Sequence, residues 1–175
     1  WAKNVPTAYS PFLLFPVQTK RQTGLLIPRI STSDRKGFEY EQPLFIALSR
    51  NTDATIYADY MSDRGTKIGA EFRYVLDNKT KGSMFLDLLE DDKIDDGTNK
   101  TKDYRFSTTP QRTNSDRYWF RMKHSQELDN GLTAKLDIDV VSDEDYLQEF
   151  KDGFTGYDET KEYFEKEFGR GIDEY

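Results

Sequence analysis

The sequence predicts an all-β fold of antiparallel, up-and-down strands, on the basis of three observations. Apolar and polar side chains alternate over several segments, which is the period of a half-buried strand. Short stretches rich in Asp, Asn and Gly, the residues that turns favour, separate these segments. The chain is 33% charged and only 35% hydrophobic, but its 11 Tyr and 12 Phe lie largely within the alternating segments, which favours a folded chain over a disordered one.

Seven strands are expected along the chain. The clearest is 66–76, where Ile68 and Phe72 share one face and Lys67 and Glu71 share the other, a segregation that no helix would produce. The segment 132–141 alternates in the same way. The full series, in order, is 24–31, 38–48, 54–61, 66–76, 83–89, 117–124 and 132–141.

Proline interrupts the first two predicted strands. Pro28 lies within 24–31, and Pro43 lies within 38–48. A proline has no N–H to donate to a sheet, so it is confined to edges, strand starts and bulges. These two strands are therefore expected to pair more weakly than the others.

The connections differ in length at the two ends of the predicted sheet. Because successive hairpins alternate ends, the long connections 90–116 and 142–175 fall at one end. The turns at the other end are short: 51–53, 77–82 and 129–131. Such sorting is typical of an outer-membrane barrel, although a soluble β-sandwich also has alternating strands. The pattern alone leaves both folds open.

The composition argues against several classes of function. A net charge of −7 argues against nucleic acid as a partner, since binding to phosphates needs a basic surface. The chain has no cysteine and only His124, so thiolate and multi-histidine metal sites are excluded. The acidic clusters at 90–96 and 142–145 do not fit a calcium loop. No nucleophile motif or phosphate loop is present, so we expect no catalytic residue, cofactor or metal.

A collinear series of short segments runs from residue 5 to about residue 150. Its members are 5–11 (Val-Pro-Thr-Ala-Tyr-Ser-Pro), 15–17, 20–28 (Lys-Arg-Gln-Thr-Gly-Leu-Leu-Ile-Pro), 37–40, 53–55, 60–65, 71–74, 116–118 and 141–143. In this order they resemble the LptD family of lipopolysaccharide-assembly proteins, also called organic solvent tolerance proteins. No single segment is diagnostic, but the ordered series is specific.

The resemblance implies a two-part architecture in the bacterial outer membrane. Residues 1–20 would be the last strand of a periplasmic β-jelly roll and its linker, shaped by Pro11 and Pro16. Residues 21–175 would form roughly the first seven strands of a large transmembrane barrel. Since the chain begins at Trp1, we expect a piece of a longer protein.

The resemblance also implies a function and its partners. The family assembles lipopolysaccharide into the outer leaflet without breaking a bond. The implied partners are lipopolysaccharide, outer-membrane lipid, an LptE-like plug lipoprotein and an LptA-like periplasmic bridge that is reached through the jelly roll. The competing interpretations are a soluble β-sandwich or adhesin-like binding module, and a different outer-membrane channel.

Three groups of site residues follow from the same resemblance. The family's barrel opens sideways between its first and last strands, and the matching lateral-gate residues are Pro28 and Pro43. An acyl-chain path is expected along Tyr9, Phe12, Leu14, Leu25 and Ile27, unless these residues simply pack in a core. A wet lumen for the sugar head group would be lined by Glu39, Glu41, Lys67, Glu71, Arg73, Arg121 and Lys123, unless these residues form an ordinary solvated face.

Overall fold

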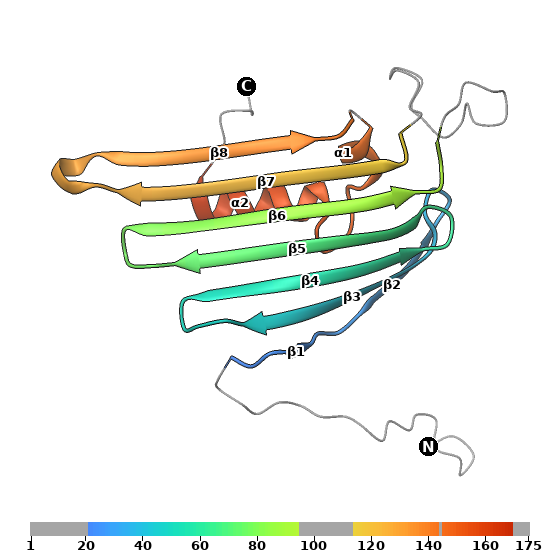
Figure 1. Ribbon diagram of the computed structural model, residues 1–175, viewed down its shortest axis with the longest axis horizontal. Helices are drawn as coiled ribbons and strands as arrows, with labels where there is room; N and C mark the ends of the chain where they lie inside the picture. The colour runs from blue at the N-terminus through green and yellow to red at the C-terminus, as the bar shows by residue number, and fades with distance from the viewer. Residues whose placement is uncertain (1–20, 95–113, 144, 170–175) are drawn as a thin grey trace, which may run out of the picture.

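The computed structural model describes residues 21–94, 114–143 and 145–169. Within these ranges the strands form one antiparallel sheet in which, from the third strand on, each strand lies beside the next along the chain (Figure 1). The strands are β1 (Gly24–Leu25), β2 (Arg29–Ser33), β3 (Gly37–Ala47), β4 (Thr52–Met61), β5 (Gly65–Val75), β6 (Thr80–Asp91), β7 (Asp116–Glu127) and β8 (Thr133–Val141). The prediction of an all-β, antiparallel, up-and-down fold is confirmed.

The first predicted strand is divided into β1 and β2, and both halves pair with β3. The second predicted strand, in contrast, continues through Pro43 as β3 without a break. The short turn between β7 and β8 depends on left-handed backbone at Asn130 (φ 67°) and Gly131 (φ 76°). Asparagine and glycine tolerate this conformation, which explains the tight turn there.

The segment after β8 contains two helices, where the sequence suggested only a long connection. They are α1 (Tyr146–Glu149) and α2 (Tyr157–Phe168), and both lie against the same face of the sheet (Figure 1). Acidic Asp158 and Glu159 in the first turn of α2 and basic Lys166 in the last complement the helix dipole. A helix of this length is marginal in water on its own, so packing on the sheet must stabilise it.

The polarity of the two faces of the sheet is the reverse of that in a soluble protein. On the face covered by α1 and α2, here called the inner face, Glu41, Asp59 and Lys67 are completely buried. On the opposite, outer face, Ile68 and Tyr118 are 45% and 43% exposed. A sheet in a soluble protein buries its apolar face and exposes its charges, so this sheet is arranged the other way round.

A small apolar cluster closes the inner face near the long connections. Met61, Leu89 and Trp119 from the sheet pack there against Tyr146 and Phe150. This cluster fixes α1 directly above the ends of β4, β6 and β7. The helices therefore have both an apolar contact and a charged contact with the sheet.

Candidate functional site

The seam between the first strand and β3 contains a bulge. Leu25 pairs with Leu44, but Arg29 pairs with Glu41, so three residues of the first strand face two residues of β3. Pro28 lies within this extra stretch. A bulge leaves one residue unpaired and locally disrupts the ladder, so the seam is irregular at Pro28.

Pro43 weakens the same seam from the other side. Its carbonyl accepts the N–H of Leu26 at 3.0 Å. In an antiparallel pair, the N–H and C=O of one residue point to the same neighbouring strand, so the N–H that Pro43 lacks would also have pointed to the first strand. The pairing of β3 with β4 on the other side continues without interruption from Glu39–Met61 to Ala47–Asp53. Both prolines thus affect one seam.

Only two residues of the predicted acyl-chain path lie within the described ranges. Leu25 is 70% exposed and lies beside the bulge, and Ile27 is 86% exposed and lies within the bulged stretch. The other members of that path, and both linker prolines, lie outside the described residues and remain predictions: Tyr9, Phe12, Leu14, Pro11 and Pro16.

All seven charged residues that the sequence assigns to a lumen lie on the inner face. They are Glu39, Glu41, Lys67, Glu71, Arg73, Arg121 and Lys123. All except Arg73, whose side chain is 35% exposed, are buried. The structure therefore gathers them in one charged layer beneath the helices.

Most of these charges have partners of opposite sign on the neighbouring strand. The Lys67 ammonium lies 3.4 Å from Asp59 and 3.9 Å from Asp87. The Arg73 guanidinium lies 2.8 Å from Asp53, and Lys123 lies 2.9 Å from Asp137. Burying a charge is costly unless it is paired, and these neighbouring strands supply the opposite charges.

The segment that carries α1 and α2 binds this charged layer directly. The backbone N–H of Phe154 donates to the Glu41 carboxylate at 3.1 Å, and the Thr155 hydroxyl donates to Asp87 at 2.9 Å. The Arg121 guanidinium lies 4.9 Å from the centre of the Phe164 ring, within the range of a cation–π contact. The inner face is thus covered by a segment of the same chain.

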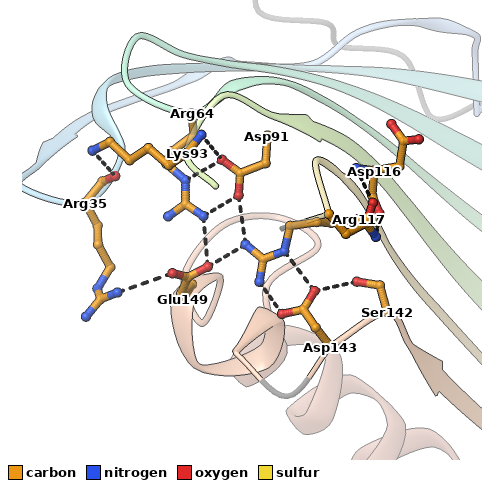
Figure 2. A network of polar contacts seen from close by, with 10 residues as sticks. Arg35, Arg64, Asp91, Lys93, Asp116, Arg117, Ser142, Asp143 and Glu149 are labelled. Carbon is orange, nitrogen blue, oxygen red and sulfur yellow. Dashed lines mark hydrogen bonds and ion pairs between the residues drawn. The ribbon is translucent and has the colours of Figure 1, made fainter. Parts of the chain in front are cut away.

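A buried ion network fixes the start of that segment to the sheet (Figure 2). Arg117 donates to Asp91 at 2.9 Å, to Glu149 at 2.5 Å and, through two nitrogens, to Asp143 at 2.9 and 2.6 Å. Arg64 donates to Asp91 at 2.8 and 2.5 Å and to Glu149 at 2.8 Å. The side chains of Arg64, Arg117, Asp91 and Glu149 are at most 1% exposed. One carboxylate of α1 is therefore shared by two buried arginines, Arg64 in the turn between β4 and β5 and Arg117 in β7.

The environment of this network favours fixed charges over proton transfer. Burial works against the charged form of Arg64, but the hydrogen bonds that it donates to Asp91 and the charges of Glu149 and Asp91 raise the pKa of its guanidinium above the ordinary value. Burial, together with the negative charge of Asp87, raises the pKa of Tyr146 well above its ordinary value. Both groups keep one protonation state at neutral pH, as a structural contact requires.

The described ranges contain no group of three or more His, Cys, Asp or Glu side chains placed to hold a metal ion. Neither of the helices described in these ranges has the length and apolarity that a membrane-spanning helix needs.

Comparison with known proteins places the chain in a family. The model of the family described as LptD protein matches residues 1–165. The chain belongs to the LptD family. This confirms the resemblance found in the short segments, and the LptD match includes both seam prolines and most of α2.

Curated LptD proteins show the same relationship. The chain is 34% identical over 160 residues to the LPS-assembly protein LptD of Idiomarina loihiensis, covering 91% of this chain and 19% of that protein. It is 34% identical to the LPS-assembly protein LptD of Pseudoalteromonas atlantica, covering 84% of this chain and 17% of that protein. It is also 34% identical to the LPS-assembly protein LptD of Xylella fastidiosa strain Temecula1, covering 86% of this chain and 17% of that protein. The chain therefore spans about a fifth of the length of the curated LptD relatives it matches.

Proposed function

We propose that this chain forms the first strands of an outer-membrane barrel that assembles lipopolysaccharide into the outer leaflet, and that the lipid leaves through a lateral gate beside the first strand, where the proline seam loosens that strand. The observation that carries the proposal is the inverted polarity of the sheet. An apolar outer face and a charged inner face suit a wall between lipid and a wet lumen. The proposal agrees with the names of the curated relatives, which are LPS-assembly proteins.

The outer face has an apolar band of suitable height. Four rows of paired side chains lie between its two edges: Ile68, Leu88 and Tyr118; Ala70, Leu86, Phe120 and Val140; Phe72, Met84, Met122 and Ile138; and Tyr74, Gly82, His124 and Leu136. Polar residues bound it on β6, with Glu90 beyond one side and Thr80 beyond the other. At ~3.4 Å per residue and a tilt near 45°, the length of β6 from Thr80 to Glu90 corresponds to about 24 Å across the membrane. This height is close to the ~25 Å apolar band of known barrels.

The seam between the first strand and β3 supplies a place where the wall is weak. It lacks the backbone bond that Pro43 would donate, and it is bulged at Pro28. Each missing bond costs about 1 kcal/mol of pairing, and more in a bilayer, where no water replaces it. We propose Pro28 and Pro43 as lateral-gate residues because a first strand that β3 holds loosely can bend and open the barrel between its first and last strands, while β3 stays paired with β4.

The remaining assignments belong to the same proposal. The short turns would face the periplasm and the long connections the cell exterior, as in other outer-membrane barrels. Residues 1–20 would join a periplasmic jelly roll, with Pro11 and Pro16 in the linker, and an LptA-like bridge would deliver lipopolysaccharide to it. Leu25 and Ile27 would contact acyl chains, the charged inner face would contact the sugar head group, and an LptE-like lipoprotein would plug the lumen. No bond is broken, so we assign no catalytic residue.

Restoring the two missing donors tests the proposed exit. In a full-length LptD-family chain that carries this segment, replacing Pro28 and Pro43 together with valine should tighten the seam and lower surface lipopolysaccharide. The donor restored at Pro43 returns one hydrogen bond to the Leu26 carbonyl, which corresponds to about 1 kcal/mol or roughly fivefold fewer open seams, and replacing Pro28 adds the N–H of a bulged residue. Surface lipopolysaccharide, normalised to the amount of folded barrel, is the measurement.

The matched control is Leu44→Val, which changes a neighbouring residue of β3 but not the number of backbone donors. It should leave surface lipopolysaccharide unchanged. Normal surface lipopolysaccharide in the double proline variant would rule out the seam as the exit.

A further inference from the structure

The seam contains a carbonyl that Pro43 leaves without a backbone donor. The register of β1 places Leu26 opposite Pro43, and the Leu26 N–H donates to the Pro43 carbonyl at 3.0 Å. In a regular antiparallel pair, the residue opposite would return a bond to the Leu26 carbonyl. Pro43 has no N–H and cannot return it.

A side chain supplies the missing donor. The Gln42 side-chain amide donates to the Leu26 carbonyl at 2.9 Å and also to the Pro43 carbonyl at 3.0 Å. The Tyr40 hydroxyl donates to the Gln42 amide oxygen at 2.9 Å. Two carbonyl oxygens can only accept, so the NH2 group of Gln42 must point toward them.

The position of Gln42 is otherwise hard to explain. It lies on the outer face of β3 in one row with Ala58 and Ile68, within the apolar band. A polar amide facing apolar surroundings is costly unless its hydrogen bonds are made. The amide nitrogen of Gln42 donates to two carbonyls of the seam, and its amide oxygen accepts from Tyr40. These hydrogen bonds account for a glutamine at this position.

We propose that Gln42 is a positioning residue that holds the first strand against β3, because its side-chain amide replaces the N–H that Pro43 lacks. We call this contact the clasp. The clasp holds the first strand against β3 through one side chain, which can rotate away without breaking the β3–β4 ladder. Tyr40 keeps the amide in its bonding orientation. The seam therefore combines a weakened backbone ladder with a releasable side-chain contact. The apolar surroundings of Gln42 and the consequence for lipid passage rest on the proposed function, whereas the hydrogen bonds of Gln42 do not.

A double-mutant cycle between Gln42 and Pro43 tests the clasp. The probe is amide hydrogen exchange of residues 24–29, measured on a full-length LptD-family chain that carries this segment, in lipid nanodiscs. Gln42→Met keeps the length of the side chain but removes both donors, so exchange should become about fivefold faster. In the Pro43→Val background the backbone donor is restored, and the same Gln42→Met change should alter exchange less than twofold.

Tyr40→Phe and Tyr60→Phe form a matched pair that does not depend on the folding of the Gln42 variant. Tyr40 and Tyr60 are paired across β3 and β4 on the outer face, but only the Tyr40 hydroxyl bonds to Gln42. Tyr40→Phe should speed exchange of residues 24–29 about twofold, and Tyr60→Phe should leave it unchanged. Three results would overturn the clasp. Gln42→Met could speed exchange equally in both Pro43 backgrounds, or it could leave exchange unchanged. The third is an equal effect of the two tyrosine changes.

Surface lipopolysaccharide, read from the same strains, separates the clasp from the proposed exit. If the cycle shows coupling while no seam variant changes surface lipopolysaccharide, the clasp stands and the exit fails. If the double proline variant lowers surface lipopolysaccharide but the cycle shows no coupling, the exit stands and the clasp fails.

Discussion

Replacing Arg117 with leucine is expected to release the segment that carries α1 and α2 from the inner face of the sheet. Arg117 is the shared partner of Asp91, Asp143 and Glu149, and its side chain is fully buried. Removing one member of a buried ion network leaves uncompensated charges and costs about 3–5 kcal/mol. Because α2 is too short to be stable alone, its amides should lose protection from hydrogen exchange once this anchor is lost.

Arg35→Leu is the matched control for this experiment. Arg35 also reaches Glu149, at 3.4 Å, but its side chain is 44% exposed. Exposed ion pairs contribute about 0–1 kcal/mol, so exchange across residues 157–168 should barely change. Full protection of α2 in Arg117→Leu would show that the apolar cluster under α1, rather than the ion network, holds the segment in place.

Replacing Leu86 with arginine is expected to destabilise the full-length barrel in lipid by about 2–4 kcal/mol, the cost of a positive charge at the membrane midplane. Leu86 lies in one of the two central rows of the apolar band, paired with Ala70 and Phe120. The measurement is the free energy of unfolding from lipid bilayers in denaturant.

Thr66→Arg provides the depth control on the same face. Thr66 pairs with Glu90 in the polar row at the edge of the band, where an arginine should cost about 0–1 kcal/mol. If the outer face contacted water, as in a soluble β-sandwich, both changes would fall within about 0.5 kcal/mol of zero. Equal, small effects at the two positions would therefore contradict a membrane wall.

The strands could be predicted from the sequence because their signal is local. Alternation in 66–76 identifies both the strand and its two faces, and the structure places β5 at Gly65–Val75. Proline chemistry likewise indicates weakness at Pro28 and Pro43. Which neighbouring strand loses the hydrogen bond was not predictable, because that depends on the pairing register, and alternation alone does not give the register.

The helical cover and the ion network could not be predicted because their contacts are distant in sequence. Arg64 and Glu149 are 85 positions apart, and nothing near either residue indicates the other. The sequence predicts only a long connection for residues 142–175. A detectable signal was present in α2, where Thr160 and Phe164 are four positions apart and both are buried.

Gln42 was missed for a related reason. A glutamine beside a proline has no special meaning in a sequence, and its role appears only when the opposite strand brings the Leu26 carbonyl within 2.9 Å. A polar residue on the otherwise apolar face of a strand was the one available signal. Such an exception to alternation is a reasonable place to look for a functional contact.

Site-specific photo-crosslinking to lipopolysaccharide tests the central claim, that the lipid leaves at the proline seam, most directly. A photoreactive residue at Ile27 lies at the seam, and one at Ile68 lies in the same row of the outer face as Gln42, but on β5. We predict strong crosslinking at Ile27, weak crosslinking at Ile68, and loss of the Ile27 product when Pro28 and Pro43 are replaced with valine. Equal crosslinking at both positions, or an Ile27 product unaffected by the proline replacements, would contradict the account.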